Sequence, residues 1–434
     1  MLERSVMKAF DEWKSSSYRS PLVVCGARQV GKTYVMKQFG ARSFERCAYL
    51  DLMKDEAKRV FEVGYNPTRV LENIELYTGV KIEPDRTLVI IDEIQEVEGA
   101  LALMKGFKED CPDIAIMAAG SYLGTAYHAG SSFPVGKVDL LDMYPMTFLE
   151  YLRAAGENLL AQKIEELDFD ALLPFDERLN SHLRKYYYVG GMPEAVRRFV
   201  EGGGDYKAAR RVQRSLLAEY DRDFSKHIKD ERDLERVRLA FASIPAHLGR
   251  ENHKFVFGHI AKGARSRDYE TALQWIVNSG LATRVYRVDK IASPLAFYRD
   301  LSAFKMYLPD VGLLGCAMEV EPADVILSNK ALVEYKGAMT EQYACQQLVA
   351  AGNVPYYWSA ASGGAELDFV AKRNGVPAPL EVKAEVNLQA KSLRSACSRT
   401  GLIGYRTSMA GYQEQDWMVN VPLWALEPYF QVER

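Results

Sequence analysis

The sequence predicts an α/β protein, with a parallel sheet at the start of the chain, a helical region in the middle and an α+β domain at the end. Between residues 20 and 150, short apolar runs alternate with helical stretches, which is typical of parallel strands covered by helices on both faces. The first apolar run leads into a glycine-rich loop, at the end of the strand where such sheets bind ligands. After residue 322, a helix, several strands and a hairpin sequence predict the α+β domain.

Composition restricts the class of protein. A length of 434 residues predicts about three domains with sizeable cores. The formal net charge of −3 excludes a generally basic coat for nucleic acid but leaves a local basic face open. Six cysteines, scattered singly without C-x-x-C pairs, favour reduced thiols and argue against zinc. Because no apolar run approaches the ~18 residues that span a bilayer, we expect a cytoplasmic protein with no membrane partner.

Residues 22 to 33 read "LVVCGARQVGKT" and contain a phosphate-binding pattern. A short buried strand is followed by Gly26, Gly31, Lys32 and Thr33, which fit G-x-x-x-x-G-K-[ST], the P-loop or Walker A pattern. Lys32 would reach the β- and γ-phosphates of ATP, and Thr33 would ligate Mg²⁺. The backbone expected to surround the phosphates is that of Gly26, Ala27, Arg28, Gln29, Val30, Gly31, Lys32 and Thr33. The alternative is an ordinary strand-turn-helix connection with a chance lysine.

The stretch at residues 87 to 95, "TLVIIDEIQ", supplies the partner that a phosphate loop needs. Its apolar run suits a buried parallel strand, and Asp92 and Glu93 follow at the end where such sheets bind ligands. Asp92 would hold Mg²⁺ through its water shell, and Glu93 would orient the attacking water as a base. An acidic helix cap would not explain why the pair lies one strand downstream of a phosphate loop. A later strand, "DIAIMAAGS", ends in Ser121, whose hydroxyl could contact the γ-phosphate or the water.

The pattern changes twice along the rest of the chain. Helical periodicity continues after the sheet and predicts a helical lid. A short helix, a turn at Gly263, a longer helix from about Ser266 to Asn278 and strand-like alternation then follow in the order of a winged helix-turn-helix. The expected domains are the P-loop core at 1–150, the lid at 151–240, the winged segment at 241–322 and the C-terminal domain at 323–434.

The winged segment carries enough positive charge to neutralise several phosphates if its basic side chains share a face, so DNA is an expected partner. The alternative is that the helix-turn-helix only packs against the ATPase, with solvated surface arginines. The basic residues concerned are Lys262, Arg265, Arg267, Arg284, Arg287 and Lys290.

With these motifs in view, the chain resembles a family of prokaryotic AAA+ ATPases that carry a C-terminal domain of the restriction-endonuclease-like type. The likeness covers nearly the whole chain and is carried by "GARQVGKT", "IIDEIQ", "AAGS", "YPMTFLEYL", "YYYVGGMPEAV", "EYDRDFSKH", "TEQY", "AELDFV" and "LEVK". The resemblance implies that Ser121 is the sensor and that the "AIMAAG" strand lies between the "LVVC" and "IIDE" strands. Where the family pattern leads us to expect an arginine, "VGKV" has Lys137, which lacks the planar fork that stabilises a transferring phosphoryl group.

The tail contains a hairpin pattern, "AELDFVAKRNGVPAPLEVKAE". If Asn374 and Gly375 form a two-residue turn, Asp368 faces Glu381 across the two strands. Opposed carboxylates repel each other unless a cation lies between them, and an oxygen-rich pair beside a lysine suits Mg²⁺ or Mn²⁺. Pro377 and Pro379 lack backbone donors and could shift this register.

A complete metal-nuclease site would use four residues of the tail. Asp368 and Glu381 would bind the metal, Lys383 would stabilise charge on a cleaved phosphodiester, and Glu341 on the preceding helix would hold a ligand or a water. The alternative is a solvated edge hairpin with a cross-strand pair between Glu366 and Lys383.

Two functions follow from these patterns. In the first, the protein is an ATPase that acts on DNA through a winged helix and a nuclease-like tail. In the second, it is a nucleotide-operated switch that signals to a protein partner, or acts within a homo-oligomer, and its tail is catalytically silent. The four tail residues favour the first, whereas Lys137 and the acidic pI of about 6.2 favour the second.

Overall fold

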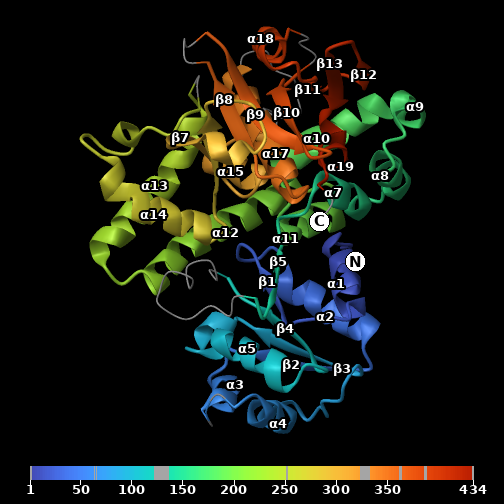
Figure 1. Ribbon diagram of the computed structural model, residues 1–434, viewed down its shortest axis with the longest axis vertical. Helices are drawn as coiled ribbons and strands as arrows, with labels where there is room; N and C mark the ends of the chain where they lie inside the picture. The colour runs from blue at the N-terminus through green and yellow to red at the C-terminus, as the bar shows by residue number, and fades with distance from the viewer. Residues whose placement is uncertain are drawn as a thin grey trace. The chain divides into compact units, whose positions relative to one another are not determined.

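The structure is a computed structural model that describes residues 2–62, 64, 66–121, 136–250, 253–322, 333–360, 364–385 and 389–432. The chain forms two compact units (Figure 1). The N-terminal unit comprises Arg4–Tyr144 with Asn278–Leu281, and the C-terminal unit comprises Met1–Glu3, Pro145–Val277 and Ala282–Arg434.

The N-terminal unit is built on a five-stranded sheet in which all printed pairings are parallel, with the order β2-β3-β4-β1-β5. This order confirms the expected parallel sheet. It also confirms that the "AIMAAG" strand lies between the "LVVC" and "IIDE" strands. The strands are β1 (Leu22–Cys25), β2 (Arg46–Asp51), β3 (Thr87–Asp92), β4 (Ala115–Ala119) and β5 (Asp139–Asp142).

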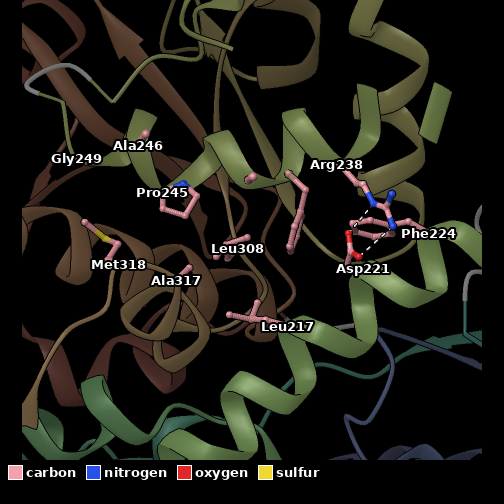
Figure 2. A pocket seen from close by; sticks show the side chains of 12 residues that line it. Leu217, Asp221, Phe224, Arg238, Pro245, Ala246, Gly249, Leu308, Ala317 and Met318 are labelled. Carbon is pink, nitrogen blue, oxygen red and sulfur yellow. Dashed lines mark hydrogen bonds and ion pairs between the residues drawn. The ribbon is translucent and has the colours of Figure 1, made fainter. Parts of the chain in front are cut away.

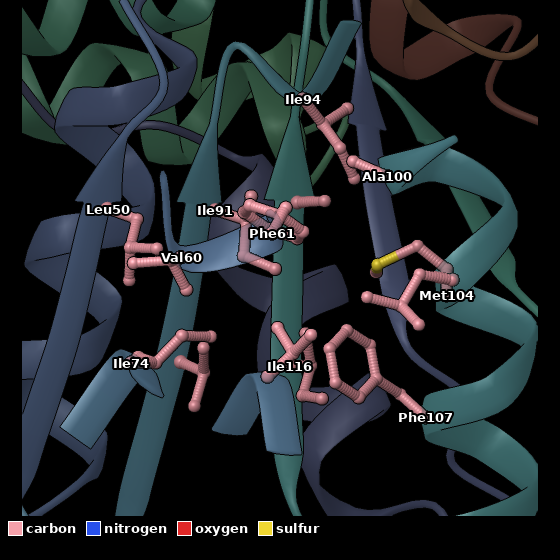
Figure 3. Packing of buried hydrophobic residues seen from close by; sticks show 14 of the residues in the cluster. Leu50, Val60, Phe61, Ile74, Ile91, Ile94, Ala100, Met104, Phe107 and Ile116 are labelled. Atoms are coloured by element: carbon pink, nitrogen blue, oxygen red, sulfur yellow. The ribbon is translucent and has the colours of Figure 1, made fainter. Parts of the chain in front are cut away.

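Helices cover this sheet because its central strands are apolar on both faces. Every residue of β3 and β4 is buried, as expected for continuous apolar runs in a parallel sheet. On one face, Ile91 and Ile116 lie in a cluster with Phe61, Met104 and Phe107 from the covering helices (Figure 3). The helices of the unit are α1 (Val6–Ser15), α2 (Lys32–Ser43), α3 (Asp55–Lys58), α4 (Pro67–Thr78) and α5 (Ala100–Asp110).

The first half of the C-terminal unit is helical, as the periodicity predicted. A Thr147–Glu150 capping box starts α7, in which each residue bonds the backbone of the other. The helices are α7 (Phe148–Ala154), α8 (Asn158–Glu165), α9 (Phe169–Leu172), α10 (Asp176–Val189), α11 (Pro193–Glu201), α12 (Tyr206–His227) and α13 (Glu231–Leu248).

Two consecutive glycines after α10 lie at a crowded junction. A Cβ on Gly190 would lie 2.2 Å from the carboxylate of Asp310, and one on Gly191 would lie 2.0 Å from the carbonyl oxygen of Met146. Asp310 accepts hydrogen bonds from the amides of Gly191 (2.5 Å) and Leu313 (3.0 Å), and burial raises its pKa to about 6. The "VGG" motif therefore joins three distant segments, a role that sequence analysis alone does not derive.

The segment expected to be a winged helix-turn-helix contains only part of the predicted pattern. The longer helix, α14 (Ser266–Asn278), agrees with the prediction, but the expected short helix is a single 3₁₀ turn, η4 (Phe257–His259). It is replaced because the amide of Phe255 donates to the carbonyl of Phe304 (3.0 Å), which holds this aromatic stretch beside a strand. The strands and helix that follow are β6 (Thr283–Val288), β7 (Arg299–Tyr307) and α15 (Val311–Ala317).

The hairpin of β6 and β7 belongs to the sheet of the tail. That sheet has eight strands in the order β12-β13-β11-β10-β9-β8-β6-β7, and β6 pairs with β8 in parallel. The expected boundary at residue 322 therefore divides one sheet, because strand patterns do not reveal which strands pair. The remaining elements are α17 (Val333–Ala350), β8 (Tyr356–Ser359), β9 (Glu366–Arg373), β10 (Val376–Val382), α18 (Lys391–Thr400), β11 (Gly404–Ser408), β12 (Gln413–Glu414), β13 (Met418–Pro422) and α19 (Leu426–Tyr429).

Candidate nucleotide and cation sites

The loop between β1 and α2 has the backbone conformation of a phosphate cradle. Gly26, Gln29 and Gly31 have positive φ values of 145°, 65° and 96°, and backbone that alternates in this way can form an anion-binding concavity. Gly26 is also required by space, because a Cβ there would lie 2.2 Å from the carbonyl oxygen of Met143. Gly31 is the N-cap of α2, which places the positive end of the helix dipole at the loop. Positive φ values, a glycine with no room for a Cβ and a helix N-terminus are features that a phosphate-binding loop requires.

Lys32 is held at the centre of this loop. Its ammonium donates to the carbonyls of Gly26 and Ala27 (both 2.9 Å) and to the hydroxyl of Ser121 (3.2 Å). Burial lowers the pKa of Lys32 to about 8, against the opposing effect of Glu93 and Asp92. The structure thus brings Lys32 and Ser121 together. A phosphate would replace the neutral partners of Lys32 with charged ones.

Thr33 and Asp92 meet at the predicted magnesium position. The Thr33 hydroxyl donates to Asp92 Oδ2 (2.7 Å), and the Tyr49 phenol donates to the same oxygen (3.0 Å). Burial raises the pKa of Asp92 above its ordinary value, although these hydrogen bonds oppose the effect. The ammonium of Lys37 lies 3.4 Å from the centre of the Tyr49 ring. Tyr49 was not predicted from the sequence. It alternates along β2 with buried residues, and this pattern does not show that its hydroxyl meets Asp92.

Glu93 follows Asp92 in a left-handed backbone conformation, with φ of 54° and ψ of 47°. Its carboxylate accepts a hydrogen bond from the side-chain amide of Gln95 (2.6 Å). A left-handed non-glycine residue is strained, and such strain is frequent at functional sites. Sequence analysis also missed Gln95, the last residue of "IIDEIQ", as a partner of the base.

ATP and Mg²⁺ fit the residues that this loop presents. Backbone amides and Lys32 match the phosphates, while the Thr33 hydroxyl and the Asp92 carboxylate are the hard oxygen ligands that Mg²⁺ prefers. Lys137, which stands where an arginine was expected, forms an ion pair with Glu109 (3.5 Å) and is 45% exposed.

The basic residues of the winged segment do not behave alike. Arg284 forms an ion pair with Glu270 (2.6 Å), and its side chain is 5% exposed. Arg287 forms ion pairs with Asp300 (2.7 Å) and Asp289 (3.2 Å). These two arginines already have acidic partners, so the prediction that the segment neutralises several phosphates depends on the other four. The exposed ones are Lys262, Arg265, Arg267 and Lys290.

The tail hairpin forms in the predicted register. Asn374 and Gly375 have positive φ values of 49° and 77°, and the ladder runs from Val376 opposite Arg373 to Leu380 opposite Phe369. Glu381 and Asp368 come next on the two strands. The ladder ends there, because the Asp368 carboxylate accepts the amide of Val382 (2.7 Å).

The alternative of a solvated edge hairpin is wrong in two respects. The strands β9 and β10 lie inside the sheet, between β8 and β11. Glu366 pairs with Lys254 (3.0 Å) and Lys305 (3.1 Å), whereas Lys383 pairs with Glu381 (2.7 Å). Glu366 and Lys383 therefore do not pair with each other as that alternative expected, because each has its own ion-pair partners.

Glu341 has different partners from those expected of a metal-site residue. Its carboxylate accepts hydrogen bonds from His253 (2.8 Å) and Tyr307 (3.2 Å) and lies 3.7 Å from the ammonium of Lys305. Burial alone would raise the pKa of Glu341, but Lys305, His253 and Tyr307 together lower it to about 2. Sequence analysis missed His253 and Lys305 because they precede the tail by many residues.

The other two expected residues of the tail site are Asp368 and Glu381. Burial raises the pKa of Asp368 to about 7, with a further contribution from Glu341. Glu381 Oε2 is buried and lacks a hydrogen-bond partner within the described part of the chain. Over the same residues, no group of three or more His, Cys, Asp or Glu side chains is arranged to hold a metal ion. A metal ion at Asp368 and Glu381 therefore stays a prediction.

The C-terminal unit also contains a cavity of about 640 Å³. Its wall is mainly apolar, with Leu308 and Met318 among the lining residues, and an ion pair between Arg238 and Asp221 (2.7 Å) lies at one side (Figure 2). It contains none of the predicted site residues.

Across the described ranges, no helix is both long and apolar enough to cross a membrane.

Three segments of the chain match known families. Residues 18–152 match a family described as AAA domain, residues 180–324 match a domain of unknown function (DUF8612), and residues 336–426 match another (DUF4143). The first match, together with the parallel sheet and the loop geometry, supports a P-loop AAA+ ATPase domain over residues 18–152. No curated protein sequence matches the chain.

Solved structures with partial likeness include two Orc structures and one Cdc6 structure. The Orc1 protein of Aeropyrum pernix in complex with DNA is 12% identical, with 72% of this chain and 90% of that chain covered and a TM-score of 0.27. Drosophila ORC bound to DNA is 12% identical, with 72% of this chain and 94% of that chain covered and a TM-score of 0.27. Cdc6p from Pyrobaculum aerophilum has 11% identity, 79% and 96% coverage and a TM-score of 0.26. Likeness at this level does not establish a shared function.

Proposed function

We propose that the protein is a Mg²⁺-dependent cytoplasmic ATPase that acts on DNA through its winged segment and its nuclease-like tail. The observation that carries the ATPase proposal is the joint placement of Lys32, Thr33, Asp92 and Glu93 around one glycine-rich loop. Bound Mg²⁺ would neutralise charge on the ATP phosphates. Lys32 binds the phosphates, Thr33 and Asp92 hold the ion, and Glu93 accepts the proton of the attacking water.

The DNA proposal depends on charge in the winged segment. Four exposed basic side chains are present at Lys262, Arg265, Arg267 and Lys290, and exposed lysines and arginines supply the salt-dependent part of DNA binding. In the tail, Asp368 and Glu381 would hold one Mg²⁺ or Mn²⁺ ion, and Lys383 would lie beside the charge of a phosphodiester.

A second function, a nucleotide-operated switch with a silent tail and a protein partner or a second copy of the chain, is favoured by two observations. Lys137 is paired with Glu109 in the position where an arginine was expected. Glu341, the expected fourth nuclease residue, is already bound by His253 and Lys305. Under this function the ATPase would report nucleotide occupancy without DNA cleavage.

One experiment separates the two functions. ATP hydrolysis by the full chain is measured with and without duplex DNA, and cleavage of plasmid DNA is measured with Mn²⁺. Stimulated hydrolysis together with cleavage that Asp368→Asn abolishes supports the DNA-directed enzyme. Hydrolysis without stimulation or cleavage supports the switch, and absence of ATP binding overturns both.

A further inference from the structure

The buried carboxylates of the tail raise an electrostatic question. Glu341, Glu366 and Asp368 lie close enough together that all three act on the ammonium of Lys305. Three neighbouring carboxylates destabilise a fold unless positive charge compensates them. The sequence pattern assigned that task to a metal ion, but the chain itself supplies a cation.

Lys305 is placed to act as that cation. Its ammonium lies 3.1 Å from Glu366 Oε1 and 3.7 Å from Glu341 Oε2, and its side chain is only 2% exposed. The ring of Tyr357 lies 5.1 Å away and excludes water from one side. A buried ammonium is costly without anionic partners, so this arrangement depends on the carboxylates as much as they depend on it.

The carboxylates of the tail differ in their partners. Glu341 and Glu366 form one half of the cluster, and Asp368 and Glu381 form the other. Glu341 is bound by Lys305, His253 and Tyr307, and Glu366 is bound by Lys254 and Lys305. In the other half, Glu381 Oε2 has no hydrogen-bond partner among the residues that the structure describes. Glu381 pairs through Oε1 with Lys383 (2.7 Å). Lys305, Lys254 and His253 are the basic partners of Glu341 and Glu366.

We propose that Lys305 is the resident counter-cation of this carboxylate cluster, and that its ammonium keeps a divalent ion from Glu341 and Glu366. A divalent ion is then confined to Asp368 and Glu381, a statement that rests on the cation site of the proposed function. Lys305 acts through the carboxylates and is a positioning residue. Because it lies on β7, the cluster needs a residue from outside residues 323–434.

The counter-cation role is tested without metal by a double-mutant cycle in the full chain. Lys305→Met keeps an unbranched side chain, one heavy atom shorter, and removes its charge, so the urea midpoint of unfolding should fall strongly in EDTA. Adding Glu366→Gln removes one of the carboxylate charges that Lys305 compensated. The double variant should recover at least half of the fall in urea midpoint. The control is Lys336→Met, which breaks a more exposed pair with Glu385 (2.8 Å) and should cause a much smaller fall.

No restoration in the double variant would overturn the proposal. If Lys305→Met is insoluble, a soluble double variant supports the proposal, and an equally insoluble one contradicts it. Mn²⁺ should raise the midpoint of Lys305→Met more than that of the unchanged chain, because Glu341 and Glu366 become available. An equal rise in both would refute exclusion of the ion by Lys305. If no variant responds to Mn²⁺, the metal site of the proposed function fails, while the cycle in EDTA still decides the role of Lys305.

Discussion

Tyr49 and Thr33 donate hydrogen bonds to the same carboxylate oxygen of Asp92, at 3.0 and 2.7 Å. The carboxylate of Asp92, the expected magnesium ligand, is thus fixed from two directions, by a helix and by a neighbouring strand. A carboxylate held in this way needs less ordering when the ion binds.

The first prediction concerns Tyr49→Phe, which removes only the phenol hydroxyl. The Mg²⁺ concentration for half-maximal ATP hydrolysis should rise about tenfold, because a hydrogen bond to a charged group contributes about 1.5 kcal/mol. ATP binding in EDTA should not change. Tyr34→Phe is the control, since the Tyr34 hydroxyl accepts a hydrogen bond from the side-chain amide of Gln38 (2.7 Å) at an exposed site. An unaltered Mg²⁺ requirement would remove Tyr49 from the site.

The second prediction separates Lys32 from Glu93. Lys32→Ala should weaken ATP binding about 100-fold, because it removes the charge at the phosphates. Glu93→Gln should keep ATP affinity but lower kcat about 100-fold, since the amide retains the shape and lacks the base. Equilibrium titration and steady-state turnover measure the two effects. Equal loss of ATP binding in both variants would rule out the base role of Glu93.

The third prediction is a pH dependence of ATP affinity. The pKa of Lys32 is lowered to about 8 in the free chain, and bound phosphates would raise it again. The charged form therefore dominates below pH 8, and affinity should fall by up to about tenfold per pH unit above that value. Lys32→Arg, whose guanidinium stays protonated, should show a flat profile over the same range. A fall in affinity toward lower pH would contradict the burial effect.

The fourth prediction tests the winged segment. Reversal of charge at Arg265 and Arg267 should weaken DNA binding and reduce the slope of log affinity against log salt by about 2, if each contacts one phosphate. The control reverses Arg222 and Arg232, which are exposed on α12 and in the first turn of α13. Equal effects of the two double variants would show that only overall charge matters.

The fifth prediction concerns the glycine junction of the C-terminal unit. Gly191→Ala places a Cβ against the backbone of Met146 and should destabilise this unit by about 3 kcal/mol or more. Gly337→Ala, in α17 with open space around it, should instead stabilise by about 0.5–1 kcal/mol. Urea unfolding of the full chain measures both. Tolerance of the Gly191 change would mean that the junction can relax.

The sequence predicted the AAA domain and its parallel sheet because both follow local rules. The spacing of Gly26, Gly31 and Lys32 is fixed by one loop, and the five strands of the sheet follow from apolar runs of strand length. The turn at Asn374 and Gly375 also depends on two adjacent residues, which explains why its register was predicted correctly.

The rest depends on contacts between segments that are far apart in the sequence. Lys305 meets Glu341 and Glu366 only because β7 joins the sheet of the tail, and no local pattern shows that pairing. One signal was present in "LSAFKMYL", where a single lysine interrupts an apolar strand. A lysine at such a position needs a buried anionic partner, so it could have prompted a search for one.

The pairing of β6 with β8 also determines where the chain can be cut. A fragment that begins at residue 323 would leave the backbone edge of β8 without its partner strand. Unpaired strand edges act as templates for aggregation, so such a fragment should form insoluble assemblies even if its own helices and strands fold. A fragment that contains the tail must begin before β6, at about Ala282, so that the hairpin of β6 and β7 covers the edge of β8.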